Sequence, residues 1–98
     1  MCYEVVLLST ATEDISDMLE YYGRFYPGTA RKRYAELMEK LRGLSSQPLK
    51  YPEFEPKPKY RRMVSGDYLA LYSVNEAEKM VRVYRVIPGK LNLDELLK

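Results

Sequence analysis

Apolar residues in the first half of the chain recur with the three- and four-residue spacing of an α-helix. The first set predicts one apolar helix face and consists of Ile15, Met18, Leu19 and Tyr22. The acids between them are expected to face solvent, and they are Glu13, Asp14, Asp17 and Glu20. Thr10 and Glu13 have the spacing of a capping box, which predicts that this helix starts at Thr10.

A second helix is predicted after the break at Tyr26 and Pro27, with Gly28 or Thr29 as its cap. Its apolar positions are Ala30, Tyr34, Leu37, Leu41 and Leu44. Because only a short turn separates the two helices, they are expected to form a helical hairpin. The basic block 31–33 is interpreted as a solvated face, with contact to a partner as the alternative.

The other periodic segments predict strands. Residues 3–8 are β-branched and apolar at both alternating sets of positions, as in a strand buried on both faces or one lying beside a sheet partner. Three runs rich in tyrosine and β-branched residues follow later, at residues 59–64, 66–74 and 81–90. Their turns, at residues 65–67 and 75–79, contain glycine and asparagine, which tolerate positive φ, so the runs predict an antiparallel meander. Residues 91–97 are expected to form a short helix or tail.

A proline-rich loop, residues 45–58, separates the helices from the meander. Its four prolines are Pro48, Pro52, Pro56 and Pro58. Proline at this density disfavours a helix or a central strand. Tyr51 and Phe54 are expected to pin the loop to the core, with ligand binding as the alternative.

These elements together predict an α+β fold of order β-α-α-β-β-β, as a single domain over residues 1–98. A lone meander cannot bury its apolar face, so the helical hairpin is expected to pack on one face of a small antiparallel sheet. The strand at residues 3–8 would complete the edge of this sheet. The opposite face is expected to stay open.

Composition narrows the classes of function. The chain of 98 residues is 46% hydrophobic and 31% charged, as in a folded soluble protein. It has one cysteine, Cys2, and no histidine, so it lacks the commonest general base and zinc ligand. The sequence has no P-loop, zinc-binding or serine-hydrolase motif, and we expect no metal or cofactor. No window suits a membrane span and no basic leader precedes residue 3, which predicts a cytoplasmic protein.

The net charge of +2 is unevenly distributed, since residues 57–90 hold eight bases and three acids, a balance of +5. Alternation along the last strand places Arg82 and Arg85 on opposite faces. The residues that look like its core parity are Val81, Val83 and Ile87. Arg82 and Tyr84 would then be exposed, and Arg85 would need a partner or an edge position. Such arginines and tyrosines suit contact with phosphates and bases, or simply a solvated sheet face.

Five short motifs follow one another along nearly the whole chain. They are residues 3–7 leading into 11–15, the spacer 44–48, and the segments 60–64, 68–74 and 83–90. In this order they resemble the RelE/ParE superfamily, the toxins of bacterial type II toxin-antitoxin systems. The resemblance implies a toxin of an addiction module, of the kind linked to plasmid stabilisation, with a cognate antitoxin as its partner.

The superfamily has two branches: RelE-like toxins cleave mRNA in the ribosomal A site, and ParE-like toxins inhibit DNA gyrase. Where RelE-like nucleases carry two arginines and a C-terminal tyrosine, this chain aligns Leu69, Leu91 and Leu97. On the second strand Arg61 keeps a basic residue, whereas Met63 replaces another. Leucine can neither stabilise a developing phosphorane charge nor transfer a proton.

The resemblance therefore implies a ParE-like toxin that binds a target such as DNA gyrase and is neutralised by its antitoxin. Two alternatives stay open: a ribosome-dependent, metal-independent mRNA endoribonuclease with a substituted active site, and a non-toxic member that only binds its antitoxin. No catalytic residue is assigned. Contacts to the target or to RNA are expected from Arg61, Arg62, Arg82, Arg85 and Lys90.

Overall fold

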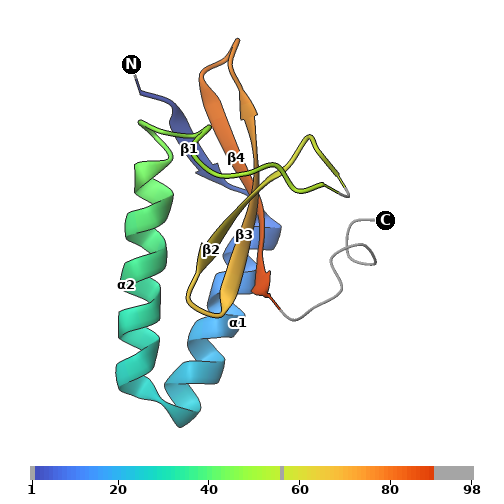
Figure 1. The fold of residues 1–98 in the computed structure, drawn as a ribbon. Helices are drawn as coiled ribbons and strands as arrows, with labels where there is room; N and C mark the ends of the chain where they lie inside the picture. The colour runs from blue at the N-terminus through green and yellow to red at the C-terminus, as the bar shows by residue number, and fades with distance from the viewer. Residues whose placement is uncertain (1, 56, 90–98) are drawn as a thin grey trace.

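The computed structural model describes residues 2–55 and 57–89 and shows two helices packed on a four-stranded sheet (Figure 1). The helices are α1 (Ser9–Phe25) and α2 (Pro27–Gly43). The strands are β1 (Glu4–Leu7), β2 (Arg61–Ser65), β3 (Tyr68–Asn75) and β4 (Met80–Pro88). The α+β class and the element order expected from the sequence are confirmed. The expected tail at residues 91–97 lies outside the described residues.

The strand order in the sheet is β1-β4-β3-β2. Strands β2, β3 and β4 form the expected antiparallel meander, whereas the edge strand β1 pairs with β4 in parallel. The sheet is therefore mixed. The cause lies in the helical hairpin: α1 and α2 each have 17 residues, so the chain returns to the end of the sheet where β1 began. Strands β2 and β4 then run in the direction of β1 (Figure 1).

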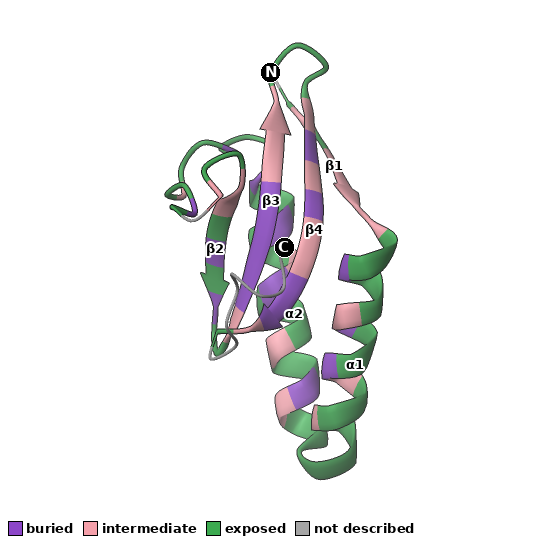
Figure 2. Cartoon of the chain, turned by 90° about the vertical axis from the view of Figure 1, so that its right-hand side faces the viewer, coloured by how far each residue is buried: buried purple, intermediate pink, exposed green. Residues whose placement is uncertain are grey.

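The main core lies between the helical hairpin and the sheet (Figure 2). Its buried side chains include Ala11, Ile15, Met18, Leu37, Leu41, Met63, Ala70, Tyr72, Val81, Val83 and Val86. The apolar stripe expected on each helix is thus confirmed, with one exception. Tyr34 is 40% exposed, and the neighbouring Arg33 lies against the β2–β3 turn at Gly66.

Both expected helix caps are wrong. Helix α1 begins at Ser9 without a side-chain cap, and the Thr10 hydroxyl instead donates a hydrogen bond of 2.6 Å to the Tyr84 carbonyl in β4. Helix α2 begins at Pro27, so Gly28 and Thr29 lie inside it. Proline suits the first helical position, because its fixed φ is helical and its missing N–H would have no partner there.

The two turns of the meander differ in how they reverse the chain. Gly66 has a φ of +60°, as expected for a glycine in a tight hairpin. In the second turn the residue with positive φ is Lys79, at 54°, and not Asn75. The Asn75 side chain instead accepts a hydrogen bond from the Glu78 N–H at 3.0 Å. This local bond holds the turn, which is a common use of asparagine.

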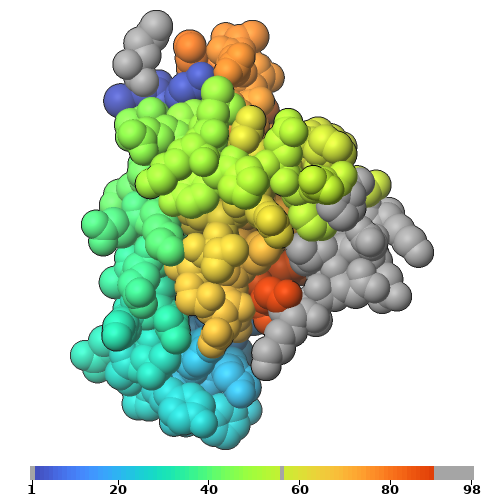
Figure 3. Space-filling view, viewed as in Figure 1, coloured from blue at the N-terminus to red at the C-terminus, as the bar shows by residue number. Residues whose placement is uncertain are grey.

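The proline-rich loop crosses the upper part of the molecule in Figure 3, where its atoms form a continuous band. Its aromatic residues pin it to the protein, as expected. Tyr51 packs on the main core, and Phe54 is buried with Leu69 and Leu71 in a second cluster. The second cluster lies on the sheet face away from the helices. The expectation that this face stays open is therefore wrong near Phe54.

Candidate functional site

A β-bulge in β4 decides which side chains share a sheet face. Tyr72 pairs with Val83 and Leu71 pairs with Arg85, which leaves Tyr84 as the extra residue. A bulge shifts the alternation of side chains by one residue. The odd-numbered residues of β4 therefore face the main core before Tyr84, and the even-numbered residues face it afterwards. The core position of Val83 is confirmed. Ile87 is buried but pairs with Leu69 of the second cluster, so its expected parity is wrong.

The candidate arginines do not form one cluster. Arg61 and Arg82 line a hollow of about 650 Å³ beside the end of β3, at a level where β2 has only begun. We call this site the basic hollow, and the residues that set its chemistry are Glu53, Lys59, Arg61, Ser73, Asn75, Glu76 and Arg82. Three cations against two acids leave it a formal charge of only +1.

Most of the positive charge in the basic hollow already has a partner within the protein. Arg61 Nη1 donates to the Tyr51 carbonyl at 2.6 Å. Arg82 Nη2 lies 3.1 Å from Glu78 Oε1 in an ion pair whose side chains are 34% and 55% exposed. A surface pair of this kind is weak, so a partner could displace it.

The tyrosines beside the basic hollow contact each other. The Tyr60 and Tyr84 rings meet edge to face, with their centroids 4.9 Å apart, and Lys59 Nζ lies 5.1 Å from the Tyr60 centroid. Tyr84 and Arg82 are both half-buried, so the exposure expected for them is only partial. These rings do not form the parallel, open platform on which bases would stack.

The other candidate residues lie elsewhere. Arg62 is exposed on β2, and its backbone N–H donates to the Pro52 carbonyl at 3.0 Å. Lys90 lies outside the described residues. Arg85 lies on the far part of β4, beside α1 rather than beside Arg82.

Arg85 forms a two-point ion pair with Asp14 of α1. Its Nε lies 2.7 Å from Asp14 Oδ2 and its Nη2 lies 3.1 Å from Oδ1. Asp14 Oδ2 also accepts the Val86 N–H at 2.9 Å. The hydrogen bond to Asp14 is the main cause that raises the pKa of Arg85. The expectation that Arg85 needs a partner or an edge position is confirmed on both counts.

The expectation that Asp14 faces solvent is wrong, since its side chain is only 14% exposed. The cause is the shortness of β1, which pairs with β4 only as far as Leu7 and Val83. Beyond that point no strand within residues 2–55 and 57–89 lies beside the outer edge of β4, and α1 runs along it (Figure 2). Asp14 supplies the acceptor that a longer β1 would have supplied.

A second hollow, of about 590 Å³, lies between α1 and the end of β4. We call it the tyrosine groove, and its main residues are Asp17, Tyr21, Tyr22, Asp67, Tyr68, Arg85 and Pro88. Burial is the main cause that raises the pKa of Tyr68, with smaller contributions from Tyr22, Tyr21 and Asp67. Sequence reasoning missed this site because Tyr22 looked like core and Asp17 like a solvated acid.

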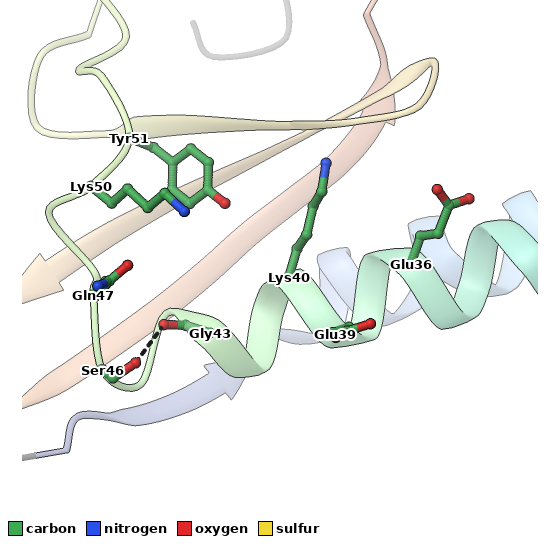
Figure 4. Close-up of a pocket in the computed structure, with 8 residues that line it drawn as sticks. All are labelled: Glu36, Glu39, Lys40, Gly43, Ser46, Gln47, Lys50 and Tyr51. Carbon is green, nitrogen blue, oxygen red and sulfur yellow. Dashed lines mark hydrogen bonds between the residues drawn. The ribbon is translucent and has the colours of Figure 1, made fainter.

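A third hollow, of about 400 Å³, lies between the end of α2 and the start of the proline-rich loop (Figure 4). Its charges balance, with Glu36 and Glu39 against Lys40 and Lys50. Lys40 Nζ points to the sheet and donates to the Val64 carbonyl of β2 at 2.9 Å. A lysine at an edge strand discourages pairing with a further strand, so we assign this hollow a structural role.

The two substituted nuclease positions that the structure describes are apolar and buried. Leu69 is 7% exposed and packs in the second cluster, and Met63 is fully buried in the main core. Neither position presents a charge to a phosphate. Leu91 and Leu97 lie outside the described residues. Among residues 2–55 and 57–89, no three potential metal ligands gather closely enough to hold a metal ion.

Comparison with known protein families gives a match over most of the chain. The model of the ParE toxin of the type II toxin-antitoxin system parDE matches residues 5–92. Among curated protein sequences none matches significantly. Neither helix in the described part of the chain has the length and apolar character of a membrane span.

Several solved structures share the fold at low sequence identity. A chain of the chromosomal ParDE system of Pseudomonas aeruginosa has a TM-score of 0.73 and 16% identity, over 88% of this chain and 95% of that one. A chain of the RelBE toxin-antitoxin complex of Mycobacterium tuberculosis has a TM-score of 0.65 and 23% identity, over 90% of this chain and 92% of that one. A chain of the archaeal RelE-RelB complex of Pyrococcus horikoshii has a TM-score of 0.57 and 20% identity, over 93% of this chain and 100% of that one.

Proposed function

Because the chain belongs to the ParE toxin family of type II toxin-antitoxin systems, we propose that it inhibits growth by binding a protein target such as DNA gyrase. A cognate antitoxin neutralises it by covering its contact surfaces. The similar folds from Mycobacterium tuberculosis and Pyrococcus horikoshii come from complexes of this kind, which supports an antitoxin partner. Toxin and antitoxin would both act in the cytoplasm.

The burial of Leu69 is the observation that most favours binding over RNA cleavage. A RelE-like nuclease needs a cation at this position, and the leucine here packs against Phe54 and Leu71. An arginine in its place would bury a charge without a partner, which costs several kcal/mol. This packing of Leu69 supports a function in binding.

We assign the contacts with the target to Arg61, Arg62 and Arg82. Arg61 and Arg82 line the basic hollow and Arg62 is exposed on the same strand as Arg61. Lys90, which follows β4 in the sequence, is a further candidate. Arg85 is held by Asp14, and its proposed role is to position α1 on β4.

Induction of the chain in a bacterial host tests this proposal, with a DNA-damage reporter and mapped transcript ends as readouts. We expect growth arrest with damage signalling. The combined Arg61→Ala, Arg62→Ala and Arg82→Ala variant should lose the arrest. The matched control removes three exposed cations of α2, by Arg31→Ala, Lys32→Ala and Arg42→Ala, and should stay toxic.

The other outcomes each contradict the proposal in a distinct way. Codon-biased cleavage of mRNA would identify an endoribonuclease. Unimpaired growth with a stable, soluble protein would identify a non-toxic member that only binds its antitoxin. Toxicity that survives the triple substitution would remove the arginines from the contact surface.

A further inference from the structure

The tyrosine groove continues into a row of aromatic rings along α1. The Tyr68 ring lies 6.2 Å from Tyr22, and the Tyr22 ring lies 5.4 Å from Tyr21. Phe25 follows at 5.4 Å from Tyr21. Tyr21 and Phe25 are 55% and 57% exposed. Partly exposed aromatic rings in a row are typical of protein contact surfaces, where they act as anchors.

The row leads to the tip of the helical hairpin, which projects beyond the sheet (Figures 1 and 2). Tyr26 at this tip is 57% exposed, and its ring lies 6.5 Å from that of Phe25. Adjacent exposed aromatic rings of this size form an apolar patch, and such a patch on a monomer marks an interaction surface.

The edge of β4 that borders the groove cannot accept a further strand. The Tyr84 carbonyl is bonded to the Thr10 hydroxyl at 2.6 Å, and the Val86 N–H is bonded to Asp14 at 2.9 Å. Pro88 has no N–H to donate. An occupant of the groove therefore binds through its side chains and not by backbone pairing.

The charge of the groove is negative. Its lining contains three acids and one base, which gives a formal charge of −2; these residues are Asp14, Asp17, Asp67 and Arg85. Arg85 is neutralised by Asp14, while Asp17 and Asp67 form no salt bridge with any residue in ranges 2–55 and 57–89. Carboxylates beside tyrosine rings favour a guanidinium or an ammonium and repel nucleic acid.

We propose that the tyrosine groove is the docking surface for a partner protein that presents an amphipathic helix with a basic residue. The arginine or lysine binds at Asp17 and Asp67, and an apolar side chain of the same helix packs on Tyr21 and Tyr22. The inference rests on the proposed function only in assuming a protein partner. It places the amphipathic helix on a surface that is separate from the basic hollow and of opposite charge.

A peptide titration of the purified chain tests the groove directly. The probe is an alanine-based peptide of about 20 residues, long enough to be helical in water, with one arginine and a leucine on either side at helical spacing. The matched probe replaces arginine by neutral citrulline. Binding is followed by fluorescence anisotropy, and the contact surface is mapped by NMR chemical shifts.

We expect the arginine peptide to shift the resonances of Tyr21, Tyr22 and Tyr68 and to bind about tenfold more tightly than the citrulline peptide. Combined Asp17→Asn and Asp67→Asn should remove this difference. Tyr21→Ala should weaken both peptides. The control variants are Glu39→Gln and Tyr34→Ala, which alter an exposed acid and an exposed tyrosine of α2 and should bind like the unchanged chain.

Equal affinity of the two peptides would overturn the proposal, as would shifts that map to Arg61 and Arg82. Absence of binding up to about 1 mM would also overturn it, since a contact that weak contributes only about 4 kcal/mol. Tighter binding of a third peptide, with glutamate in place of the arginine, would overturn it too, because the partner would then be acidic. The titration does not depend on toxicity, so its result is distinct from that of the induction experiment.

Discussion

The basic hollow and the tyrosine groove lie at opposite ends of β3 and β4, and they use charge in opposite ways. In the basic hollow the arginines that stand out in the sequence already contact Tyr51 and Glu78. In the tyrosine groove the one arginine is held by Asp14, and two other acids face the solvent beside tyrosine rings. A charge that is conspicuous in the sequence is therefore not always a charge offered to a partner.

The largest loss of stability is expected at the tyrosine groove, from Asp14→Ala. This change leaves the Arg85 guanidinium and the Val86 N–H without their acceptor. We expect a loss of about 3 kcal/mol in the free energy of unfolding, because a partly buried charge loses its partner. Urea unfolding followed by circular dichroism measures it.

Asp17→Ala is the matched control for that measurement, one turn further along α1. Asp17 is exposed, so its removal should change the stability by no more than about 0.5 kcal/mol. Equal effects of the two substitutions would contradict the role of the ion pair. The double variant Asp14→Ala, Arg85→Ala should lose less than the sum of its single variants, since the two residues act as a pair.

The next effect concerns Tyr72, which lies in the core between the two regions. Its hydroxyl donates to the Pro48 carbonyl at 2.7 Å, and burial raises its pKa to about 12. Tyr72→Phe leaves that carbonyl without this donor and should cost about 1–2 kcal/mol. The comparable change at an exposed ring, Tyr34→Phe, should be neutral.

The raised pKa of Tyr72 also predicts a dependence of stability on alkaline pH. The fold favours the neutral phenol, so this contribution is complete below pH 10, near the pKa in the unfolded chain, and is lost as the pH rises to about 12. Unfolding curves between pH 9 and 12 should show a smaller loss for Tyr72→Phe than for the unchanged chain. Parallel curves would assign the alkaline loss to other groups.

The smallest effect is expected in the basic hollow. Arg82→Ala removes the pair with Glu78, both of whose side chains are partly exposed, and should cost at most about 1 kcal/mol. Thermal unfolding at low and at high salt measures it. A larger loss would show that Arg82 supports the fold and is not held for a partner.

The helices and the meander were predictable because their signals are local. The spacing of Ile15 and Met18 and the turn at Gly66 each depend on only a few neighbouring residues. The caps expected at Thr10 and at Gly28 or Thr29 are wrong because other contacts decide where the helices begin. Thr10 bonds to β4 instead of capping its own helix, and Pro27 starts α2 before Thr29.

The candidate sites were less predictable because they depend on contacts between distant parts of the chain. Asp14 and Arg85 are 71 residues apart, and they meet because β1 ends early. The bulge at Tyr84 changes the parity of β4 without any glycine or proline to mark it. The tyrosine groove combines α1, the β2–β3 turn and the end of β4, so no single segment of the sequence points to it.

We propose that this toxin acts by binding a protein target and not by cutting RNA. The most direct measurement adds the purified chain to two assays in parallel, supercoiling by DNA gyrase and cleavage of mRNA on programmed ribosomes. We expect that supercoiling is inhibited, that added antitoxin restores it, and that the mRNA stays intact. Cleaved mRNA with unaffected gyrase would contradict it.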